Sequence, residues 1–276
     1  MRMTGALLQS SHPGPSAVVT VITVLLGVAV GLGPFRIVLL GLTMALTQLS
    51  VGLSNDWLDA ARDRDAGRKD KPIARGEIAV AAVRIAALTS AVLAVLVSLT
   101  LGIPFALAHL VALGGGWAYN AWFKHGPLSP LPYVVSFGLL PTLATLALPG
   151  PSLAAWWAVL AGGLLGIAAH VANVLPDLAD DAATGVRGLP HRLGRVGSTL
   201  LGGLALTGAA VALSLGIGLN SPVALVGFGL SLAASVASVV FTLRGSRWGF
   251  RFVIVAALVD VLLLVLAGER IVVPLI

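Results

Sequence analysis

Apolar residues form long stretches along this chain, separated by short segments that are polar or contain glycine and proline. Nine stretches are about 20 residues long, and a helix of that length crosses the roughly 30 Å of hydrocarbon in a bilayer. They occupy residues 17–33, 37–56, 79–101, 104–123, 129–148, 153–178, 196–217, 222–243 and 251–273. Lipid offers no partners for backbone N–H and C=O groups, so each stretch is expected to be helical. The pattern predicts an all-α membrane protein with nine transmembrane helices, forming a single domain over residues 1–276.

The composition excludes a soluble domain. Apolar residues make up 58% of the chain and charged residues 10%, which is too little charge to cover a water-exposed surface. The N-terminal segment lacks the features of a cleaved signal peptide, so the first span is expected to remain. The chain contains no cysteine, which excludes disulfides and thiolate chemistry. In a membrane protein the basic excess marks the cytoplasmic face, so no nucleic-acid partner is expected.

The positions of the basic residues predict the orientation. Fifteen of the 17 Lys and Arg residues lie at the N-terminus or in and beside alternate loops. They are Arg2, Arg62, Arg64, Arg68, Lys69, Lys71, Arg75, Arg84, Lys124, Arg187, Arg192, Arg195, Arg244, Arg247 and Arg251. The expected location is the cell (inner) membrane. The positive-inside bias then places the N-terminus and these loops in the cytoplasm and the C-terminus on the other side.

Acidic residues are concentrated in two segments. Nine of the 11 lie within residues 55–77 and 173–181. At about 100° per residue, Asn55, Asp59 and Asp63 follow one face of a helix, and Asp56 falls within the same arc of about 100°. In the second segment a comparable arc holds Asn173, Asp177, Asp180 and Asp181. Carboxylates that share a stripe at the end of an apolar span repel one another, so they need cations to remain ionised.

The two segments are related by a shift of 118 residues. Seven of 22 positions are then identical, including the pairs Asn55 and Asn173, Asp59 and Asp177, and Asp63 and Asp181. This indicates two four-helix repeats, over about 37–148 and 153–273, with one extra helix before them. An even number of spans separates the segments, so both are expected on the same face. Parallel repeats form sites between their halves, so the stripes can face one cavity.

The residue types at these positions predict a metal site. Oxygen ligands without cysteine, at an open rim, favour magnesium, which keeps waters and is shared with substrate phosphates; manganese is the alternative. The metal candidates are Asn55, Asp56, Asp59, Asp63, Asp177 and Asp181. Basic residues on the same face, among them Arg68, Lys71, Lys124 and Arg192, suit a diphosphate that the metal bridges to the carboxylates. Asn55 and Asn173 are the further candidates for binding the diphosphate. The simpler alternative is a solvated helix end, but that gives no reason for the repeat.

These motifs resemble those of the UbiA superfamily of intramembrane prenyltransferases. Asn55-Asp56-x-x-Asp59-x-x-x-Asp63 followed by Lys71-Pro-Ile-Ala-Arg-Gly is similar to its first signature, and Asp177-x-x-x-Asp181 followed by Leu189-Pro-His-Arg-Leu-Gly to its second. Tyr119-x-x-x-x-Lys124 is similar to a third element. The resemblance implies magnesium-dependent transfer of an isoprenyl group from its diphosphate to a small hydrophobic acceptor, aromatic or lipid, within the bilayer. It also implies that Lys124 and Lys71 contact the diphosphate. Lys71 stands where the family usually has Arg.

Other residues are candidates for roles in such a site. His170 shares the arc of Asn173, so it could orient an acceptor or remove its proton; the alternative is an interhelical hydrogen bond. Aromatic rings that could stabilise an allylic cation, or simply pack, are Trp117, Tyr119, Trp122 and Phe137. Asp260 lies deep in the last span, where an acid is either functional or protonated. His109 is expected to be structural.

Three other functions fit parts of the pattern. A terpene cyclase of the same superfamily would use the same metals with an intramolecular alkene as nucleophile. A phosphoribosyltransferase would act on a polyprenyl phosphate. A transporter would also carry intramembrane acids, but here the acids lie at helix ends and not at the midplane.

Overall fold

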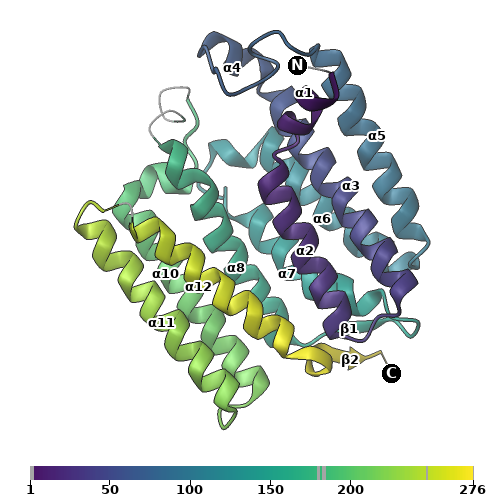
Figure 1. Ribbon diagram of the computed structural model, residues 1–276, viewed down its shortest axis with the longest axis vertical. Coiled ribbons are helices and arrows are strands. Elements are labelled where there is room, and N and C mark those ends of the chain that lie inside the picture. The colour runs from purple at the N-terminus through teal and green to yellow at the C-terminus, as the bar shows by residue number, and fades with distance from the viewer. Residues whose placement is uncertain (1–2, 179–180, 182–184, 247, 276) are drawn as a thin grey trace.

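The protein is almost entirely helical. The computed structural model describes residues 3–178, 181, 185–246 and 248–275 (Figure 1). The long helices are α2 (Pro13–Ala29), α3 (Pro34–Leu58), α5 (Val80–Leu99), α6 (Ile103–Ala121), α7 (Leu131–Leu146), α8 (Trp156–Val174), α10 (Leu189–Ile217), α11 (Pro222–Leu243) and α12 (Trp248–Leu266). The short elements are α1 (Met3–Ser10), α4 (Ala60–Asp65), η1 (Phe123–His125), β1 (Ser152–Ala154), η2 (Leu175–Asp177), η3 (Gly268–Ile271) and β2 (Val272–Pro274).

A long helix lies at each of the nine apolar stretches. Within the described residues, six helices are individually long and apolar enough to cross a membrane: α3, α5, α8 with η2, α10, α11 and α12. Helices α1 and α2 meet at a bend of 64° and together count as a seventh. Helix α7 is a shorter apolar helix. The chain is therefore a multi-pass membrane protein, and the count of nine spans stays a prediction.

Close contact between α7 and α8 joins the two groups of helices that the chain forms (Figure 1). Gly162 and Gly166 of α8 lie against the backbone carbonyls of Phe137 and Tyr133, so a Cβ at either glycine would clash with the backbone of α7. Backbones that approach this closely need the smallest side chains at the contact. The pairing of α7 with α8 therefore depends on glycine at these two positions.

The chain segments that follow the two acidic segments share a backbone feature. Gly67 and Gly185 have φ of +64° and +86°; Gly76 has φ of +75°, and Gly194, at a kink inside α10, has φ of +65°. These are the glycine pairs related by the 118-residue shift. A positive φ is unfavourable for residues with a side chain, so the turn itself requires glycine. The agreement supports the predicted repeat, which remains a prediction.

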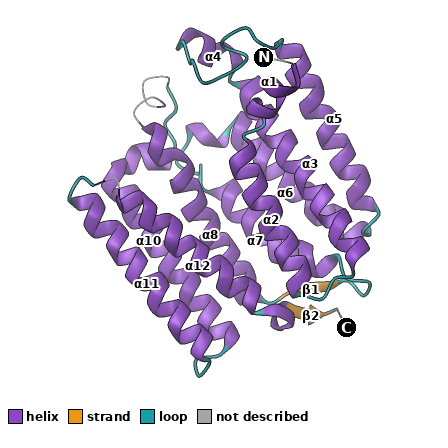
Figure 2. Ribbon diagram, viewed as in Figure 1, coloured by secondary structure: helices purple, strands orange, loops and turns teal. Residues whose placement is uncertain are grey.

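Two strands close the end of the bundle opposite the acidic segments (Figure 2). β1 and β2 pair antiparallel, with Ser152 opposite Pro274. The amide of Ala155 also donates to the carbonyl of Ile271 at 2.7 Å. The helices flanking these strands are consequently shorter than the apolar stretches: α8 begins at Trp156 and α12 ends at Leu266. Hydrophobicity alone does not distinguish the β-branched Val272 and Val273, which pair as a strand, from the helix before them.

Candidate active site

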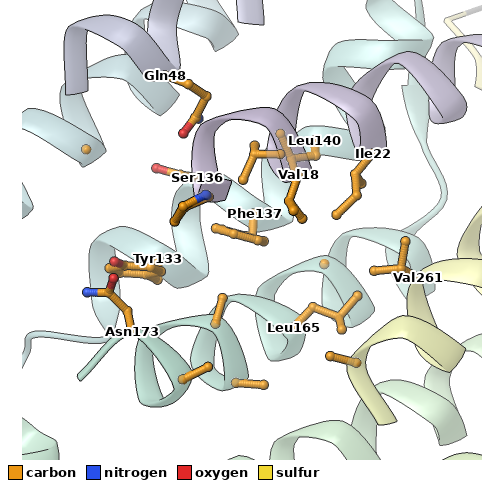
Figure 3. Close-up of a pocket in the computed structure, with 18 of the residues that line it drawn as sticks. Val18, Ile22, Gln48, Tyr133, Ser136, Phe137, Leu140, Leu165, Asn173 and Val261 are labelled. Atoms are coloured by element: carbon orange, nitrogen blue, oxygen red, sulfur yellow. The ribbon is translucent and has the colours of Figure 1, made fainter. Parts of the chain in front are cut away.

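A cavity of about 640 Å³ lies among α2, α3, α6, α7, α8 and α12 (Figure 3). Most of its lining is apolar, with Ile22 and Leu26 from α2, Phe137 and Leu140 from α7, and Leu165 from α8. No charged side chain lines it among the described residues. The cavity therefore suits a hydrocarbon ligand.

The polar groups of the cavity lie mainly at one end. Tyr119, Asn120 and Tyr133 line it there, together with Asn173 from the C-terminal part of α8. Asn173 begins the second acidic segment, and Figure 3 shows it beside Tyr133. We call this end the mouth. The mouth therefore adjoins the acidic residues, and the rest of the cavity extends away from them into the bundle.

The cavity also opens sideways between α2 and α12. Val18 of α2 lines it and is 54% exposed, and Leu258 of α12 lines it and is 59% exposed. Side chains that face both a cavity and the molecular surface mark an opening. Because both helices are apolar on this side, the opening faces the hydrocarbon of the membrane and not water.

The first acidic segment has nearly continuous helical geometry. Helix α3 ends at Leu58 and α4 begins at Ala60, and Asp59 between them keeps helical dihedral angles. Its amide donates to the carbonyl of Asn55, and the amide of Asp63 donates to the carbonyl of Asp59. The predicted spacing of these three residues on one helix is thus retained.

Asn55 is linked to the mouth of the cavity. Its side-chain amide donates to Asn120 at 3.3 Å, and Asn120 in turn donates to the Ser54 hydroxyl at 2.8 Å and to the carbonyl of Val51 at 2.9 Å. This network fixes α3 against α6. It places the first acidic segment directly beside the polar end of the cavity.

Cations neutralise the buried carboxylates of this segment. Asp59 and Asp63 are 6% and 4% exposed. Arg62 donates to Asp59 at 2.8 Å and to Asp63 at 3.3 Å, and the Lys124 ammonium donates to the other oxygen of Asp59. Burial raises the pKa of the Asp63 carboxyl, against the effect of Arg62. Burial also lowers the pKa of Lys124, against the effect of Asp59. The carboxylates of Asp59 and Asp63 are thus concentrated here and paired with cations.

Asp56 has different partners from its neighbours. Its Oδ1 accepts a hydrogen bond from Lys71 at 2.6 Å and lies 3.1 Å from His12 Nε2. It is 2% exposed, and its Oδ2 is buried without a hydrogen-bond partner among the described residues. Asp56 therefore does not share the cations that hold Asp59 and Asp63.

The second acidic segment is more open. Asp177, in η2, is exposed, and Asp181 is half-buried with Oδ2 3.7 Å from His191 Nε2. Asp180 lies outside the described residues. Burial raises the pKa of Asp181, and the positive charges of His191 and Arg62 oppose this. An arginine of the first segment therefore acts on a carboxylate of the second, so the fold brings the two segments together.

Arg68 also lies between the segments. It donates to both carboxylate oxygens of Asp70, at 2.9 and 2.8 Å, and this pairing raises the pKa of its guanidinium. The charges of Asp177 and Asp63, one from each segment, raise that pKa further. Arg192 is exposed at the start of α10, where its Nε donates to the carbonyl of Arg187 at 3.3 Å. Arg2 and Arg247 lie outside the described residues.

His170 lies behind the cavity wall. It is 1% exposed, its Nε2 is 3.0 Å from the Ser129 hydroxyl, and it is not among the described residues that line the cavity. Its ring lies against Tyr119 and Tyr133, with centroids 5.6 and 5.0 Å away, and both tyrosines do line the cavity. His170 therefore reaches the cavity only through these rings.

The other aromatic candidates divide into two groups. Tyr119 and Phe137 line the cavity. Trp117 instead donates to Ser50 at 3.1 Å and packs edge-on against Trp57, and Trp122 is 72% exposed on the surface. Only the first group is placed to meet a ligand in the cavity.

Two buried polar residues lie away from the cavity. His109 has its Nε2 2.7 Å from the Thr47 hydroxyl and stacks on Phe105, which fits the expected structural role. Asp260 is fully buried in α12, and its carboxyl group interacts with the hydroxyl of Ser231 in α11.

The acidic residues are arranged as pairs. Within the described residues, no three His, Cys, Asp or Glu side chains are close enough together to hold a metal ion by themselves. Asp59 with Asp63, and Asp177 with Asp181, are the pairs on the two segments. The donor set consists of oxygen ligands, which Mg²⁺ prefers, and two carboxylates leave room for water and phosphate oxygens around such an ion. The residues therefore fit a metal shared with a ligand.

Comparison with known proteins identifies the family. The model of the UbiA prenyltransferase family matches residues 16–253. The chain belongs to this family. A comparison with curated protein sequences finds no match.

Solved structures of UbiA homologues share the fold. One from Archaeoglobus fulgidus, bound to GPP and Mg²⁺, superposes with a TM-score of 0.72 at 16% identity, over 96% of this chain and 99% of the other. A homologue from Aeropyrum pernix K1 gives 0.70 at 14% identity, over 94% and 96%. A digeranylgeranylglyceryl phosphate synthase gives 0.70 at 14% identity, over 98% and 99%.

Several residues of this UbiA family site were not predicted from the sequence. Arg62 follows Asp59 by three residues, a spacing that places the two on one helical turn and could have revealed the ion pair. His12 and Tyr133 approach the site from distant parts of the chain, and no spacing in the sequence connects them to it.

Proposed function

We propose that the protein is a magnesium-dependent intramembrane prenyltransferase that ionises an isoprenyl diphosphate and transfers the prenyl group to a small hydrophobic acceptor. One observation carries the proposal. An apolar cavity, open to lipid on one side, ends at two acidic segments, and the cations Arg62, Arg68 and Lys124 lie beside their carboxylates. A ligand that suits both parts has a hydrocarbon tail and a highly charged head. The A. fulgidus homologues, bound to GPP or DMAPP with Mg²⁺, support this proposal.

The diphosphate would lie between the two acidic segments. Asn55, Asp59, Asp63, Asp177 and Asp181 would hold the metal, with Asn173 beside them at the mouth. Mg²⁺ bound there would neutralise the diphosphate and stabilise it as a leaving group. In the structure, Arg62 and Lys124 form ion pairs with Asp59 of the first segment.

The basic residues would then exchange partners. Lys124 and Arg62 are already beside Asp59, so a small movement turns their N–H groups towards phosphate oxygens that arrive with the metal. Arg68, placed between the segments, would contact the same group, as would Lys71 from the loop after α4 and Arg192 from the start of α10. Charge-assisted hydrogen bonds of this kind are about twice as strong as neutral ones.

The prenyl tail would occupy the apolar cavity. Moving a long hydrocarbon chain through water is unfavourable, and the opening between α2 and α12 lets the tail enter directly from lipid. Once the carbon–oxygen bond of the donor breaks, the allylic cation lies at the mouth. Tyr119 and Tyr133 line the mouth and Phe137 lines the adjoining wall, so their rings would be available to stabilise the cation.

His170 is placed to position these tyrosines. It contacts both rings from behind and is itself fixed by Ser129, whose hydroxyl also accepts from the amide of Leu189 at 2.9 Å. Its position behind the wall supports orientation of Tyr119 and Tyr133 rather than direct proton removal from an acceptor.

The acceptor would be an uncharged molecule. The cavity lining contains Gln48 and Ser136 as polar groups away from the mouth, and no charged side chain among the described residues (Figure 3). A charged acceptor would lie there without a counter-ion, at a high desolvation cost. An apolar molecule with a hydroxyl or carbonyl group fits this lining.

Product analysis tests the proposal. Purified protein in lipid nanodiscs is incubated with C5, C10, C15 and C20 prenyl diphosphates, with and without a lipid extract as acceptor source. We expect diphosphate release that requires Mg²⁺ and an alkylated product that requires the extract. Release with a cyclised hydrocarbon and no need for acceptor would instead show a cyclase. Isotope flux into proteoliposomes without release would show a transporter.

A further inference from the structure

Asp56 belongs to a separate cluster at the rim of the site. Lys71 Nζ lies 2.6 Å from Asp56 Oδ1 and 3.0 Å from His12 Nε2, and His12 Nε2 is 3.1 Å from the same carboxylate oxygen. The three side chains come from α3, from the loop after α4 and from the junction of α1 with α2. Since His12 is 41% exposed and Asp56 2%, the cluster lies at the boundary between the protein interior and the surface.

The backbone conformation of His12 also indicates that the cluster of His12, Asp56 and Lys71 is a specific arrangement. His12 has φ of +52° and ψ of +62°. Among the described residues it is the only non-glycine residue with a positive φ. It lies where α1 and α2 meet at 64°. Histidine is tolerated in this region better than most residues, but the conformation still costs free energy. The ring offsets that cost through its Nε2, which accepts from Lys71 in one tautomer and donates to Asp56 in the other.

A second set of contacts ties α1 to the same loop. Gln9 donates to the carbonyl of Asp70 at 2.9 Å and accepts from Arg75 at 3.1 Å. Ile73, two residues after Lys71, is 2% exposed in a small core with Ala6 and Leu53. The backbone on both sides of Lys71 is therefore fixed, and Asp56 fixes its side chain.

Lys71 has one more N–H donor than the two that its contacts with Asp56 and His12 among the described residues can use. Its ammonium group has three N–H donors, and Asp56 and His12 occupy two directions. Its charge also acts on Asp63: burial raises the pKa of that carboxyl, and Arg62 and then Lys71 oppose the rise. Lys71 thus lies near enough to the acidic stripe to reach a ligand bound there.

We propose that Asp56 and His12 are positioning residues that hold Lys71 for the diphosphate, and that Asp56 is not a metal ligand. The inference rests on the proposed function. Two features separate Asp56 from Asp59: its cation is Lys71 and not Arg62 or Lys124, and its remaining oxygen is enclosed. An enclosed oxygen is not accessible to a metal that a ligand brings from outside.

The test compares Asp56→Asn, Lys71→Gln and the double variant that combines them. Asp59→Asn serves as the variant of a proposed metal ligand, and Asp65→Asn, at the exposed end of α4, is the control. Mn²⁺ binding is followed by electron paramagnetic resonance, and inorganic diphosphate binding by the rise in unfolding temperature. We expect Asp56→Asn to leave Mn²⁺ affinity within twofold of wild type, whereas Asp59→Asn weakens it at least tenfold. We expect Asp56→Asn and Lys71→Gln each to weaken diphosphate binding about tenfold, and the double variant to weaken it no further.

In turnover assays Asp56→Asn and Lys71→Gln should raise the KM for the prenyl diphosphate and leave kcat within about twofold. Weakened Mn²⁺ binding in Asp56→Asn would make Asp56 a ligand and overturn the proposal. Multiplying effects in the double variant would also overturn it, because the two residues would then act independently. Both binding measurements are informative even if the wild type transfers no prenyl group. Failure of the proposed function can therefore be distinguished from failure of this inference.

A further variant, His12→Ala, keeps the inference testable if Asp56→Asn fails to fold. His12→Ala keeps the ion pair between Asp56 and Lys71 and removes only the contact from the junction of α1 and α2. We expect it to weaken diphosphate binding two- to fivefold with Mn²⁺ affinity unchanged. Wild-type diphosphate binding in this variant would remove His12 from the proposal.

Discussion

Lys124 and Asp59 form a buried ion pair that joins the end of α6 to the end of α3. The two residues are 65 positions apart, and each is less than 10% exposed. The pair brings the third sequence element of the family into contact with the first acidic segment. It also places the Lys124 ammonium group, with the Arg62 guanidinium, at the carboxylate of Asp59, beside which we propose the diphosphate binds.

Replacing Lys124 should therefore reduce activity. We expect Lys124→Gln to lower kcat/KM for the donor about ten- to a hundredfold, since one charge-assisted contact contributes about 1.5–3 kcal/mol. Arg244→Gln is the matched control, because Arg244 is exposed after α11 and the same charge is lost. Equal and small effects in steady-state kinetics would remove Lys124 from the active site.

The paired carboxylates should be required for metal use. We expect Asp59→Asn and Asp177→Asn each to lose most turnover and to need more Mg²⁺ for what remains, because each removes one charged ligand. Asp65→Asn should be nearly silent, since Asp65 is exposed at the end of α4. Turnover measured against Mg²⁺ concentration decides this, and wild-type behaviour of Asp59→Asn would refute the metal assignment.

Filling the cavity should shorten the preferred donor. Ala257 lines the cavity from α12, and Ala257→Phe places a ring where we propose the tail lies. We expect a loss of at least tenfold in kcat/KM with a C20 donor and less than threefold with a C5 donor. Leu262→Phe, on the 56% exposed outer face of the same helix, is the control. A uniform loss over all chain lengths would show that the tail lies elsewhere.

Single cysteines test whether both acidic segments lie on one face of the membrane. The chain has no native cysteine, so each introduced thiol reports alone. We expect Ala66→Cys and Arg187→Cys to react alike with an impermeant reagent in sealed vesicles, and Asn220→Cys, between α10 and α11, to react from the other side. All three positions are exposed. Opposite labelling of the first two would contradict the proposed site.

The helices were largely predictable, because a bilayer imposes both a length and an apolar composition on them. Residues 222–243 show this best, since α11 has the same bounds. The polar ends of the helices were harder. The apolar stretch at 251–273 continues beyond α12, and only pairing with residues 152–154 makes its end a strand.

The spacing of the acidic residues was also legible, because helical periodicity is local. Asn55, Asp59 and Asp63 retain that periodicity in the structure. Contacts with residues from distant segments could not be predicted from the sequence. His12 reaches Asp56 across 44 positions, and Asn120 reaches Asn55 across 65. No local pattern reports such contacts, so the sequence grouped Asp56 with the metal candidates by its place in the arc alone.

The pairing of β1 with β2 affects how the membrane-facing opening is loaded. It fixes the segment after α12 to the segment before α8, and η3, just before β2, contacts α2. Helices α2 and α12 are therefore joined at that end of the bundle and converge towards it (Figure 1). Any widening between them is restricted to the end near the acidic segments. In the proposed function, a donor arriving from lipid would therefore insert its charged head first at the wide end, and its tail would follow sideways along the two helices.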